Sequence, residues 1–254
     1  MYGDWRAITT TSSFCQSILI LSTFHFNEFV LNQFANAHKV GTDSMLLGAV
    51  INASNNKIAL DIGAGTGVLA LMLAQRNSSI KITCVEIDQK SAEECKNNVK
   101  KSPWFNRIET INAEFTQYNF QQKFDLIFTN PPYYLTNNSS SESNERTKHI
   151  TPEALQSWLN KIADLLTKKG DFWMIWPSET SLKIIEMAHD TGLYVSRKIN
   201  IYSKKNKLSR NILCFNCEKK EVLNEQLIIR NEDNSYSDAY CTLTSDFHFK
   251  EFNR

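Results

Sequence analysis

The sequence predicts an α/β fold, with a mostly parallel β-sheet that is covered by helices on both faces. The run Lys57–Ile62 is apolar until a polar residue near its end, as in a strand that is buried on both sides. It leads into a glycine-rich stretch at 63–67 and then into a predicted helix at Val68–Arg76. Strands and helices continue to alternate along the chain, and this order is typical of parallel sheets.

Length and composition indicate one globular α/β domain. The chain has 254 residues, of which 42% are apolar and 22% charged, and its net charge is +1. So small a net charge provides no overall attraction to nucleic acid, and any RNA contact must come from a local patch. Six scattered cysteines and no evident signal peptide favour reduced thiols in a cytoplasmic protein. Cys214 and Cys217 have CxxC spacing, but no second pair or His cluster accompanies them, so we expect no metal.

We predict a poorly ordered N-terminal extension at 1–22 and a single domain at 23–254. The apolar run Phe14–Leu21 is too short to cross a bilayer, and it lacks the flanking features of a secretory signal. We therefore expect no membrane contact. The sequence does not fix the oligomeric state, for which a monomer is the expectation.

Two regular elements are predicted before the glycine-rich stretch. Three phenylalanines between residues 24 and 29 predict a short strand or hairpin. An apolar helix follows at Ser44–Ile51, and Thr42 or Asp43 just before it is a natural N-cap. Thr42 is also a candidate cofactor contact, although capping alone would explain it.

The glycine-rich stretch reads Asp-x-Gly-x-Gly-x-Gly from Asp61 to Gly67. Glycines let a ligand approach the backbone, and the following helix N-terminus favours acceptor or anionic groups. Glu86 ends the next strand about 20 residues further on, where a carboxylate can accept both ribose hydroxyls. A dinucleotide would require Gly or Ala where Val68 stands, and Asp61 would repel a pyrophosphate but suit an ammonium group. These features disfavour NAD and predict S-adenosylmethionine, which has a ribose and a cationic amino-acid end.

A second motif, Asn130-Pro131-Pro132-Tyr133, follows the predicted strand Phe124–Phe128. A residue before proline is pushed toward extended geometry, and two prolines fix φ and remove two backbone donors. The motif therefore offers a side-chain amide, backbone carbonyls and an aromatic ring on a stiff segment. This set suits a planar group that bears an NH2, such as the edge of a nucleobase. A proline turn that merely ends a strand is the alternative for the motif in isolation.

The other elements are predicted by the same signals. Helices are expected at Lys90–Lys100, from Thr151 to about Lys168 with its end at Gly170, and from Pro177 to about Asp190. Further strands are expected at Ile80–Val85, Arg107–Asn112, Phe172–Trp176, Leu193–Tyr202, Asn211–Cys217 and Gln226–Arg230.

Three further segments hold candidate contacts. Glu114 follows a strand at the edge where open α/β sheets bind ligands, and it is either a contact to an adenine amino group or a solvated loop acid. The Ser/Asn-rich stretch 136–148 predicts a mobile loop, either a lid or a linker, and Arg146 and His149 near its end could touch phosphate.

The segment Arg197–Arg210 holds six Lys/Arg and no acid. Such a run is usually a solvated hairpin, but it is the one concentrated basic patch and could bind phosphates. Its candidate contacts are Lys204, Lys205, Lys207 and Arg210.

Asp61–Gly67, Glu86 and Asn130–Tyr133, in this order, resemble class I amino-methyltransferases of the N6-adenine and N5-glutamine type. Lys39–Asp43 before an apolar helix, and the tail 236–247, are similar to the tRNA1(Val) adenine N6-methyltransferase family. The resemblance covers roughly residues 24–249. It implies a Rossmann-like fold with a seven-stranded sheet containing one antiparallel strand. It also implies a tRNA substrate, with the target adenosine on the 3′ side of the anticodon of a valine tRNA.

The candidate residues fall into three groups under this hypothesis. The cofactor residues are Thr42, Asp61, Gly63, Gly65, Gly67, Glu86 and Glu114. The catalytic residues are Asn130, Pro131 and Tyr133, of which the first two would accept hydrogen bonds from the target amino group while Tyr133 stacks on the base. The substrate contacts are Pro132, Arg146, His149, Lys204, Lys205, Lys207 and Arg210.

Three alternatives remain open at this point. A glutamine amide presents the same NH2 group, so the substrate could be a protein, although such enzymes carry an N-terminal helical domain for which Met1–Asn56 is too short. The target could be an adenine in rRNA or DNA, for which no added recognition domain is evident. The chain could also be a non-catalytic RNA-binding factor that keeps the cofactor fold, but the intact motifs argue against this.

Overall fold

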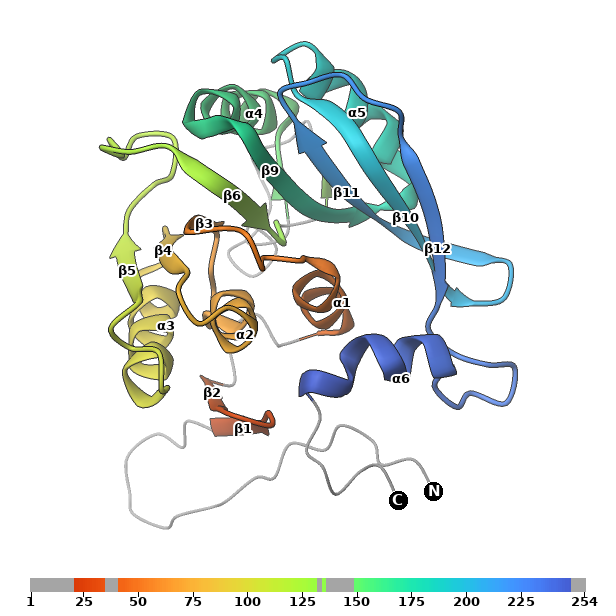
Figure 1. The fold of residues 1–254 in the computed structure, drawn as a ribbon, viewed down its shortest axis with the longest axis horizontal. Coiled ribbons are helices and arrows are strands. Elements are labelled where there is room, and N and C mark those ends of the chain that lie inside the picture. The colour runs from red at the N-terminus through yellow and green to blue at the C-terminus, as the bar shows by residue number, and fades with distance from the viewer. Residues whose placement is uncertain (1–20, 35–40, 132–133, 136–148, 248–254) are drawn as a thin grey trace.

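The computed structural model describes residues 21–34, 41–131, 134–135 and 149–247 (Figure 1). The strands are β1 (Leu21–His25), β2 (Val30–Phe34), β3 (Ile58–Ile62), β4 (Lys81–Glu86), β5 (Ile108–Asn112), β6 (Phe124–Thr129), β7 (Tyr134–Leu135), β8 (His149–Ile150), β9 (Leu166–Pro177), β10 (Tyr194–Lys204), β11 (Lys207–Asn216) and β12 (Leu223–Ile228). The helices are α1 (Thr42–Val50), α2 (Val68–Arg76), α3 (Gln89–Lys101), α4 (Pro152–Leu165), α5 (Ser181–His189) and α6 (Asp238–Thr244), with short 3-10 turns η2 (Ser178–Thr180) and η3 (Ser245–Phe247).

One eight-stranded sheet forms the centre of the molecule, in the order β12-β10-β11-β9-β6-β3-β4-β5. β3 pairs in parallel with β4 and β6, and β11 is the strand that runs antiparallel to both of its neighbours. The α/β prediction with one antiparallel strand is therefore confirmed. The predicted count of seven strands is wrong by one, because β12 adds a further edge strand parallel to β10.

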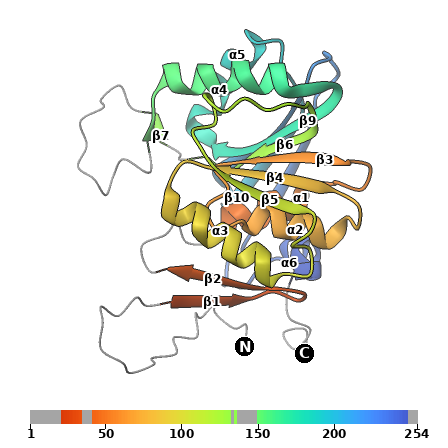
Figure 2. The same cartoon turned by 90° about the vertical axis from the view of Figure 1, so that its left-hand side faces the viewer.

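The hydrophobic core consists of two clusters, one on each face of this sheet. Side chains of α1, α2, α3 and α6 fill one cluster, and side chains of α4 and α5 fill the other. Figures 1 and 2 show these two groups of helices on opposite sides of the strands. Successive residues of a strand alternate between the faces, so Ala59 joins the first cluster and Leu60 the second. The apolar run of β3 is thus explained by burial on both sides.

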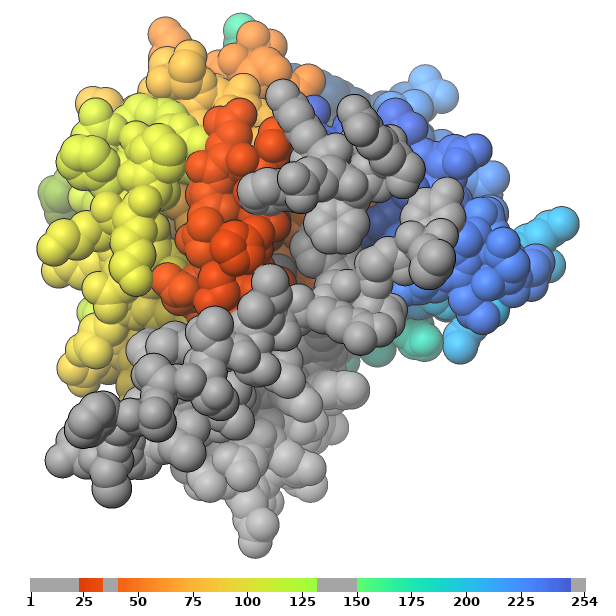
Figure 3. Space-filling view, turned by 90° about the horizontal axis from the view of Figure 1, so that it is seen from below, coloured from red at the N-terminus to blue at the C-terminus, as the bar shows by residue number. Residues whose placement is uncertain are grey.

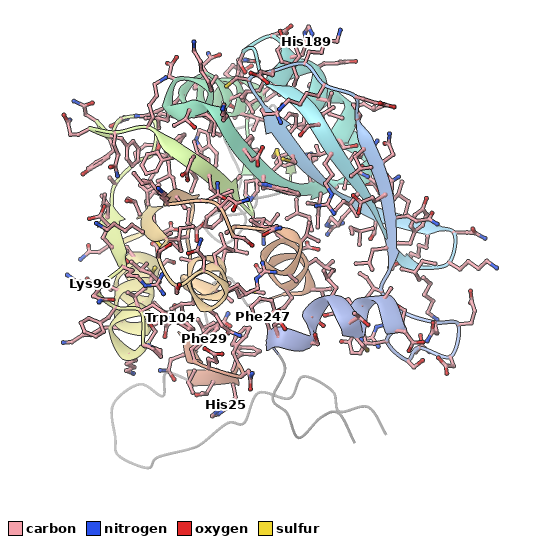
Figure 4. The ribbon with its side chains drawn as sticks, viewed as in Figure 1. His25, Phe29, Lys96, Trp104, His189 and Phe247 are labelled. Atoms are coloured by element: carbon pink, nitrogen blue, oxygen red, sulfur yellow. The ribbon has the colours of Figure 1, made fainter. Side chains whose placement is uncertain are left out.

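The predicted hairpin near the N-terminus is confirmed as β1–β2, which pack antiparallel. It lies beside α3 (Figure 3), where the ring centroids of Phe29 and Trp104 are 5.7 Å apart in an edge-to-face contact (Figure 4). Asn98 of α3 accepts from the Asn32 N–H and donates to the Asn32 carbonyl, both at 3.0 Å. β1 begins at Leu21, two residues inside the predicted extension 1–22, and residues 1–20 lie outside the described part of the chain.

Two predicted helix boundaries are wrong for identifiable reasons. α1 begins at Thr42, and its N-cap is Gly41 without a side-chain cap bond, so neither Thr42 nor Asp43 caps it. α4 ends at Leu165, and the chain passes through Gly170 as part of β9. There, β9 carries extra residues opposite β6, because Phe124 pairs with Leu166 but Leu126 pairs with Asp171. Gly170 therefore lies in a strand irregularity, a common place for glycine, and does not end a helix.

Candidate active site

The glycine loop, residues 63–67, leaves the carboxyl end of β3 and enters α2. Gly63, Gly65 and Gly67 all have positive φ, at 68°, 54° and 80°, a conformation that only glycine adopts without strain. A Cβ on Gly67 would lie 2.8 Å from Cys95 Sγ, so the loop packs tightly against α3 there. A Cβ on Gly63 or Gly65 would meet nothing within 4 Å. These two glycines therefore present bare backbone toward open space.

Asp61, at the head of this loop, is a buried carboxylate that lacks a counterion in the described structure. Its side chain is 1% exposed, and neither oxygen has a hydrogen-bond partner among the described residues. Burial raises the pKa of Asp61 well above its usual value, and the charge of Glu86 adds to the shift. The Ala70 N–H in the first turn of α2 offsets only part of this rise in pKa. An incoming cation would relieve this electrostatic cost.

Glu86 lies beside the loop at the end of β4. Its Oε2 accepts a hydrogen bond from the Gly65 N–H at 2.9 Å, and its Oε1 accepts from the Asp88 N–H at 3.0 Å. The structure thus brings together the glycine loop and the acid that the sequence places about 20 residues later. Glu114 instead accepts from the Thr116 N–H and hydroxyl at 3.1 and 2.5 Å, closing the turn after β5. Its contact to an adenine stays a prediction.

The Asn130 side chain lies at the end of β6, the strand next to β3. Ile62 pairs with Thr129 across these strands, and the Thr129 hydroxyl donates to the Ile62 carbonyl at 2.7 Å. The amide Nδ2 of Asn130 donates to Ser44 Oγ at 2.9 Å, and Pro131 is buried. Pro132 and Tyr133 lie outside the described residues. Sequence reasoning missed Ser44, because a serine near the start of a helix indicates only where the helix begins and not a contact to a distant residue.

The basic segment forms the tip of the β10–β11 hairpin, with Lys204 ending β10 and Lys207 beginning β11. The strands are longer than predicted because they pair up to Lys204 and Lys207 around Asn206, whose φ of 63° closes the turn. Arg210 reaches back to α1, where its Nε lies 3.1 Å from Asp43 Oδ2. Thr42 and Asp43 line a pocket with this arginine. Arg146 lies outside the described residues, and for His149 the structure gives the backbone alone, in β8.

The described residues contain no group of three or more His, Cys, Asp or Glu side chains that could hold a metal ion. Cys214 and Cys217 are free thiols, and burial raises the pKa of Cys214 to about 12. Within the same residues, no helix is long and apolar enough to cross a membrane.

Comparison with known proteins decides the family. The family model described as methyltransferase small domain matches residues 32–190. The Escherichia coli O157:H7 protein named tRNA1(Val) (adenine(37)-N6)-methyltransferase is 36% identical over 237 residues, which cover 91% of this chain and 97% of that protein. The chain belongs to this methyltransferase family. A protein of the same name from Escherichia coli strain K12 / DH10B is 35% identical, with coverage of 91% and 97%. The resemblance inferred from the motifs is therefore confirmed, and the chain is an enzyme of this family.

Solved structures confirm the fold of the family member. A predicted O-methyltransferase from Agrobacterium tumefaciens superposes with a TM-score of 0.63 at 18% identity, over 81% of this chain and 96% of that one. The M. jannaschii tRNA m1G37 methyltransferase superposes with a TM-score of 0.56 at 16% identity, over 79% of this chain and 57% of that one. The chain has the Rossmann-like class I methyltransferase fold.

Proposed function

We propose that the enzyme transfers a methyl group from S-adenosylmethionine to the exocyclic N6 of an adenosine in tRNA, beside the anticodon of a valine tRNA. One observation carries the proposal. β3 and β6 are adjacent parallel strands, so the glycine loop and Asn130 open at the same edge of the sheet. Parallel sheets bind ligands at the carboxyl ends of their strands. The family relatives named for this reaction support the choice of tRNA.

The residues present fit S-adenosylmethionine. Asp61 is a buried carboxylate without a partner among the described residues, and an ammonium group would neutralise it. The open space beside Gly63 and Gly65 admits the amino-acid end against bare backbone. Glu86 would accept the ribose hydroxyls, and Thr42 and Glu114 stay candidate contacts. When bound, the cofactor supplies an electrophilic methyl group on a sulfonium, and the scheme uses no metal.

Asn130 and Pro131 would activate the target amine by accepting hydrogen bonds from its two N–H groups. The Asn130 amide oxygen would accept one, and the Pro131 carbonyl would accept the other. The adenine N6 lone pair is delocalised into the ring, and two acceptors placed there draw the nitrogen toward tetrahedral geometry. Fixed acceptors also stabilise the positive charge that develops on nitrogen. Positioning contributes the rest of the rate enhancement. No general base is required, because the product ammonium is acidic enough to lose a proton to water.

Base and backbone contacts complete the proposal. Tyr133 and Pro132 would flank an adenine that is swung out of its stack, and base–aromatic stacking is worth about 1–3 kcal/mol. The basic hairpin tip with Lys204, Lys205 and Lys207 would contact phosphates, as would Arg146 and His149. The protein would act as a monomer in the cytoplasm, where tRNA is found.

The test is methyl transfer from labelled S-adenosylmethionine to total tRNA, total rRNA and release-factor protein in separate reactions. We expect label in tRNA, recovered as N6-methyladenosine after digestion to nucleosides. Label in the protein alone would favour glutamine methylation, and label in rRNA alone would favour a ribosomal target. Isothermal titration with the cofactor separates these enzymes from a non-catalytic factor, because absence of binding would contradict every methyltransferase version.

A further inference from the structure

A pocket of about 230 Å³ lies next to the proposed active site. The start of α1, the part of the β10–β11 hairpin next to its turn, and the segment after β12 line it. The hairpin and β12 lie on the right of Figure 1. Segments far apart in the sequence supply its walls. No sequence pattern singles out the pocket, although Arg210 at its edge belongs to the basic run.

The pocket is lined with hydrogen-bond donors that suit an anion. Two arginines, Arg210 and Arg230, line it together with Thr42, Ser203 and Ser209. The hydroxyls of Ser203 and Ser209 donate to the backbone carbonyls of Lys207 and Ile201, so the guanidinium groups are the donors that suit an anion. Asp43 is the acid in the lining, and the Arg210 guanidinium matches its charge at 3.1 Å. Arg230 therefore leaves the lining with a net positive charge. Glu232 and Asp233 follow in the next turn, where Asp233 accepts hydrogen bonds from the hydroxyl and N–H of Ser235. These bonds lower the pKa of Asp233, and the charge of Lys204 lowers it further.

Two contacts hold the Arg230 guanidinium at this wall. Its Nη1 donates to the Asn234 carbonyl at 2.7 Å, and its guanidinium lies 4.2 Å from the centre of the Tyr236 ring. Tyr236 also stacks on Tyr240 with 4.7 Å between ring centroids and a 15° angle between planes. Two groups so close to one ring must occupy its two faces, so Tyr236 offers no free face to a base. A guanidinium has five N–H donors, and the bond to Asn234 uses one of them. The pocket is therefore built for a phosphate and not for stacking.

One turn of α1 joins the pocket to the proposed active site. Asp43 bonds Arg210 at the pocket, and the adjacent residue Ser44 accepts the hydrogen bond from Asn130. Asn130 and the pocket therefore contact adjacent residues at the start of α1, so a base at Asn130 would bring its RNA backbone near the pocket.

We propose that this pocket binds a backbone phosphate of the substrate RNA, close to the nucleotide whose base is methylated. The inference rests on the proposed function and names a contact that the motifs do not contain. The phosphate would bind the Arg230 guanidinium, beside the side chains of Ser203 and Ser209. Arginine binds phosphate with two N–H groups at once, which also fixes the orientation of the backbone.

The experiment compares binding of a labelled, unmodified tRNA transcript to the full chain and to Arg230→Gln over a series of salt concentrations. Glutamine keeps a donor for the Asn234 carbonyl but removes the charge. Loss of one phosphate contact should lower the slope of log Kd against log salt by about 0.7–0.9 and weaken binding about 5- to 20-fold at low salt. Affinity for S-adenosylmethionine should stay unchanged. Wild-type slope and affinity in Arg230→Gln would overturn the proposal.

Lys96→Gln is the matched control, because it removes the same charge from an exposed position of α3, on the left of Figure 4 and away from the pocket. We expect it to bind tRNA as the wild type does, and an equal loss in both variants would overturn the pocket as a specific site. If Arg230→Gln lowers the melting temperature, Ser203→Asp decides instead, since it places a carboxylate in the pocket and leaves Arg230 intact. Weaker tRNA binding by Ser203→Asp supports the proposal, and unchanged binding contradicts it.

The two proposals fail in different ways. A wild-type enzyme that methylates tRNA, together with variants that bind tRNA normally, overturns the pocket alone. A wild-type enzyme that methylates no RNA contradicts the proposed function before any variant is compared.

Discussion

The amide Nδ2 of Asn130 donates a 2.9 Å hydrogen bond to Ser44 Oγ, although 86 residues separate the two in sequence. Ser44 is 8% exposed, so water does not readily replace this partner. An amide has donors at one end and an acceptor at the other. The bond to Ser44 therefore fixes which end of Asn130 serves as the acceptor, and the proposed reaction requires an acceptor.

Asn130→Ala should abolish methyl transfer while leaving S-adenosylmethionine binding nearly intact, because the residues proposed to bind the cofactor lie on other elements. Removal of one preorganised polar group commonly lowers kcat by about 10²–10³-fold. Single-turnover methylation of tRNA and cofactor titration measure the two effects. Near-normal turnover in the variant would contradict the activation scheme.

Ser44→Ala should lower kcat about 2- to 10-fold, since one hydrogen bond contributes about 0.5–1.5 kcal/mol and its loss lets the amide rotate. The KM for S-adenosylmethionine should not change, because Ser44 acts through Asn130. Steady-state kinetics separate the two constants. Ser245→Ala is a control, as its hydroxyl is exposed and donates within its own turn to the Thr242 carbonyl. The role of Ser44 would be refuted if both variants had the same kcat.

Asp61→Asn should stabilise the ligand-free protein at neutral pH and weaken cofactor binding. The pKa of Asp61 is raised in the folded protein, so the folded state holds its proton more tightly than the unfolded chain does. Stability of the wild type therefore falls as pH rises from the ordinary Asp pKa, near 3.9, through the raised one. Asparagine carries no such charge, so the variant escapes this loss.

Thermal melting of the wild type and of Asp61→Asn across pH tests this prediction. The difference in melting temperature should vanish at acid pH, where both side chains are neutral, and grow toward neutral pH in favour of the variant. Titration should show cofactor affinity at least about 10-fold weaker, consistent with a lost charge-assisted bond of about 1.5–3 kcal/mol. Equal melting curves would show that the buried charge of Asp61 does not destabilise the folded protein. Equal affinity would show that Asp61 does not bind the ammonium group of the cofactor.

Gly65→Ala and Gly67→Ala should have different effects, because Gly65 faces the space proposed for the cofactor and Gly67 packs against α3. Both impose a positive φ on alanine, which costs about 1–2 kcal/mol. A methyl on Gly67 would also lie 2.8 Å from Cys95 Sγ, so this variant should lose more stability. A methyl on Gly65 meets open space in the ligand-free protein but would fill the room proposed for the cofactor.

Denaturant unfolding and cofactor titration of both glycine variants check the comparison. We expect the larger stability loss in Gly67→Ala, and in Gly65→Ala a loss of cofactor affinity that its stability does not explain. Normal cofactor affinity in Gly65→Ala would place the ligand elsewhere.

The sequence by itself determined the strands of the parallel part of the sheet and the glycine loop, because their signals are local. An apolar run such as β3 must be buried on both faces, and glycines at positive φ can be recognised from the turn they make possible. The delayed acid Glu86 was found in the same way, from its distance along one strand–helix–strand unit. The predicted end of α4 at Gly170 was wrong, because no local pattern distinguishes a glycine that ends a helix from one that lies in a strand irregularity.

Only the tertiary structure decided which side chains meet across the sheet edge. Asp43 and Arg210 are 167 residues apart, and their contact depends on how the start of α1 lies against the start of β11. The Ser44–Asn130 bond and the place of Arg230 in the pocket beside α1 depend on how these distant segments pack. Hydrogen bonds of this kind form only at particular distances and angles, which are set by the sum of all core contacts and not by the residues beside them in sequence.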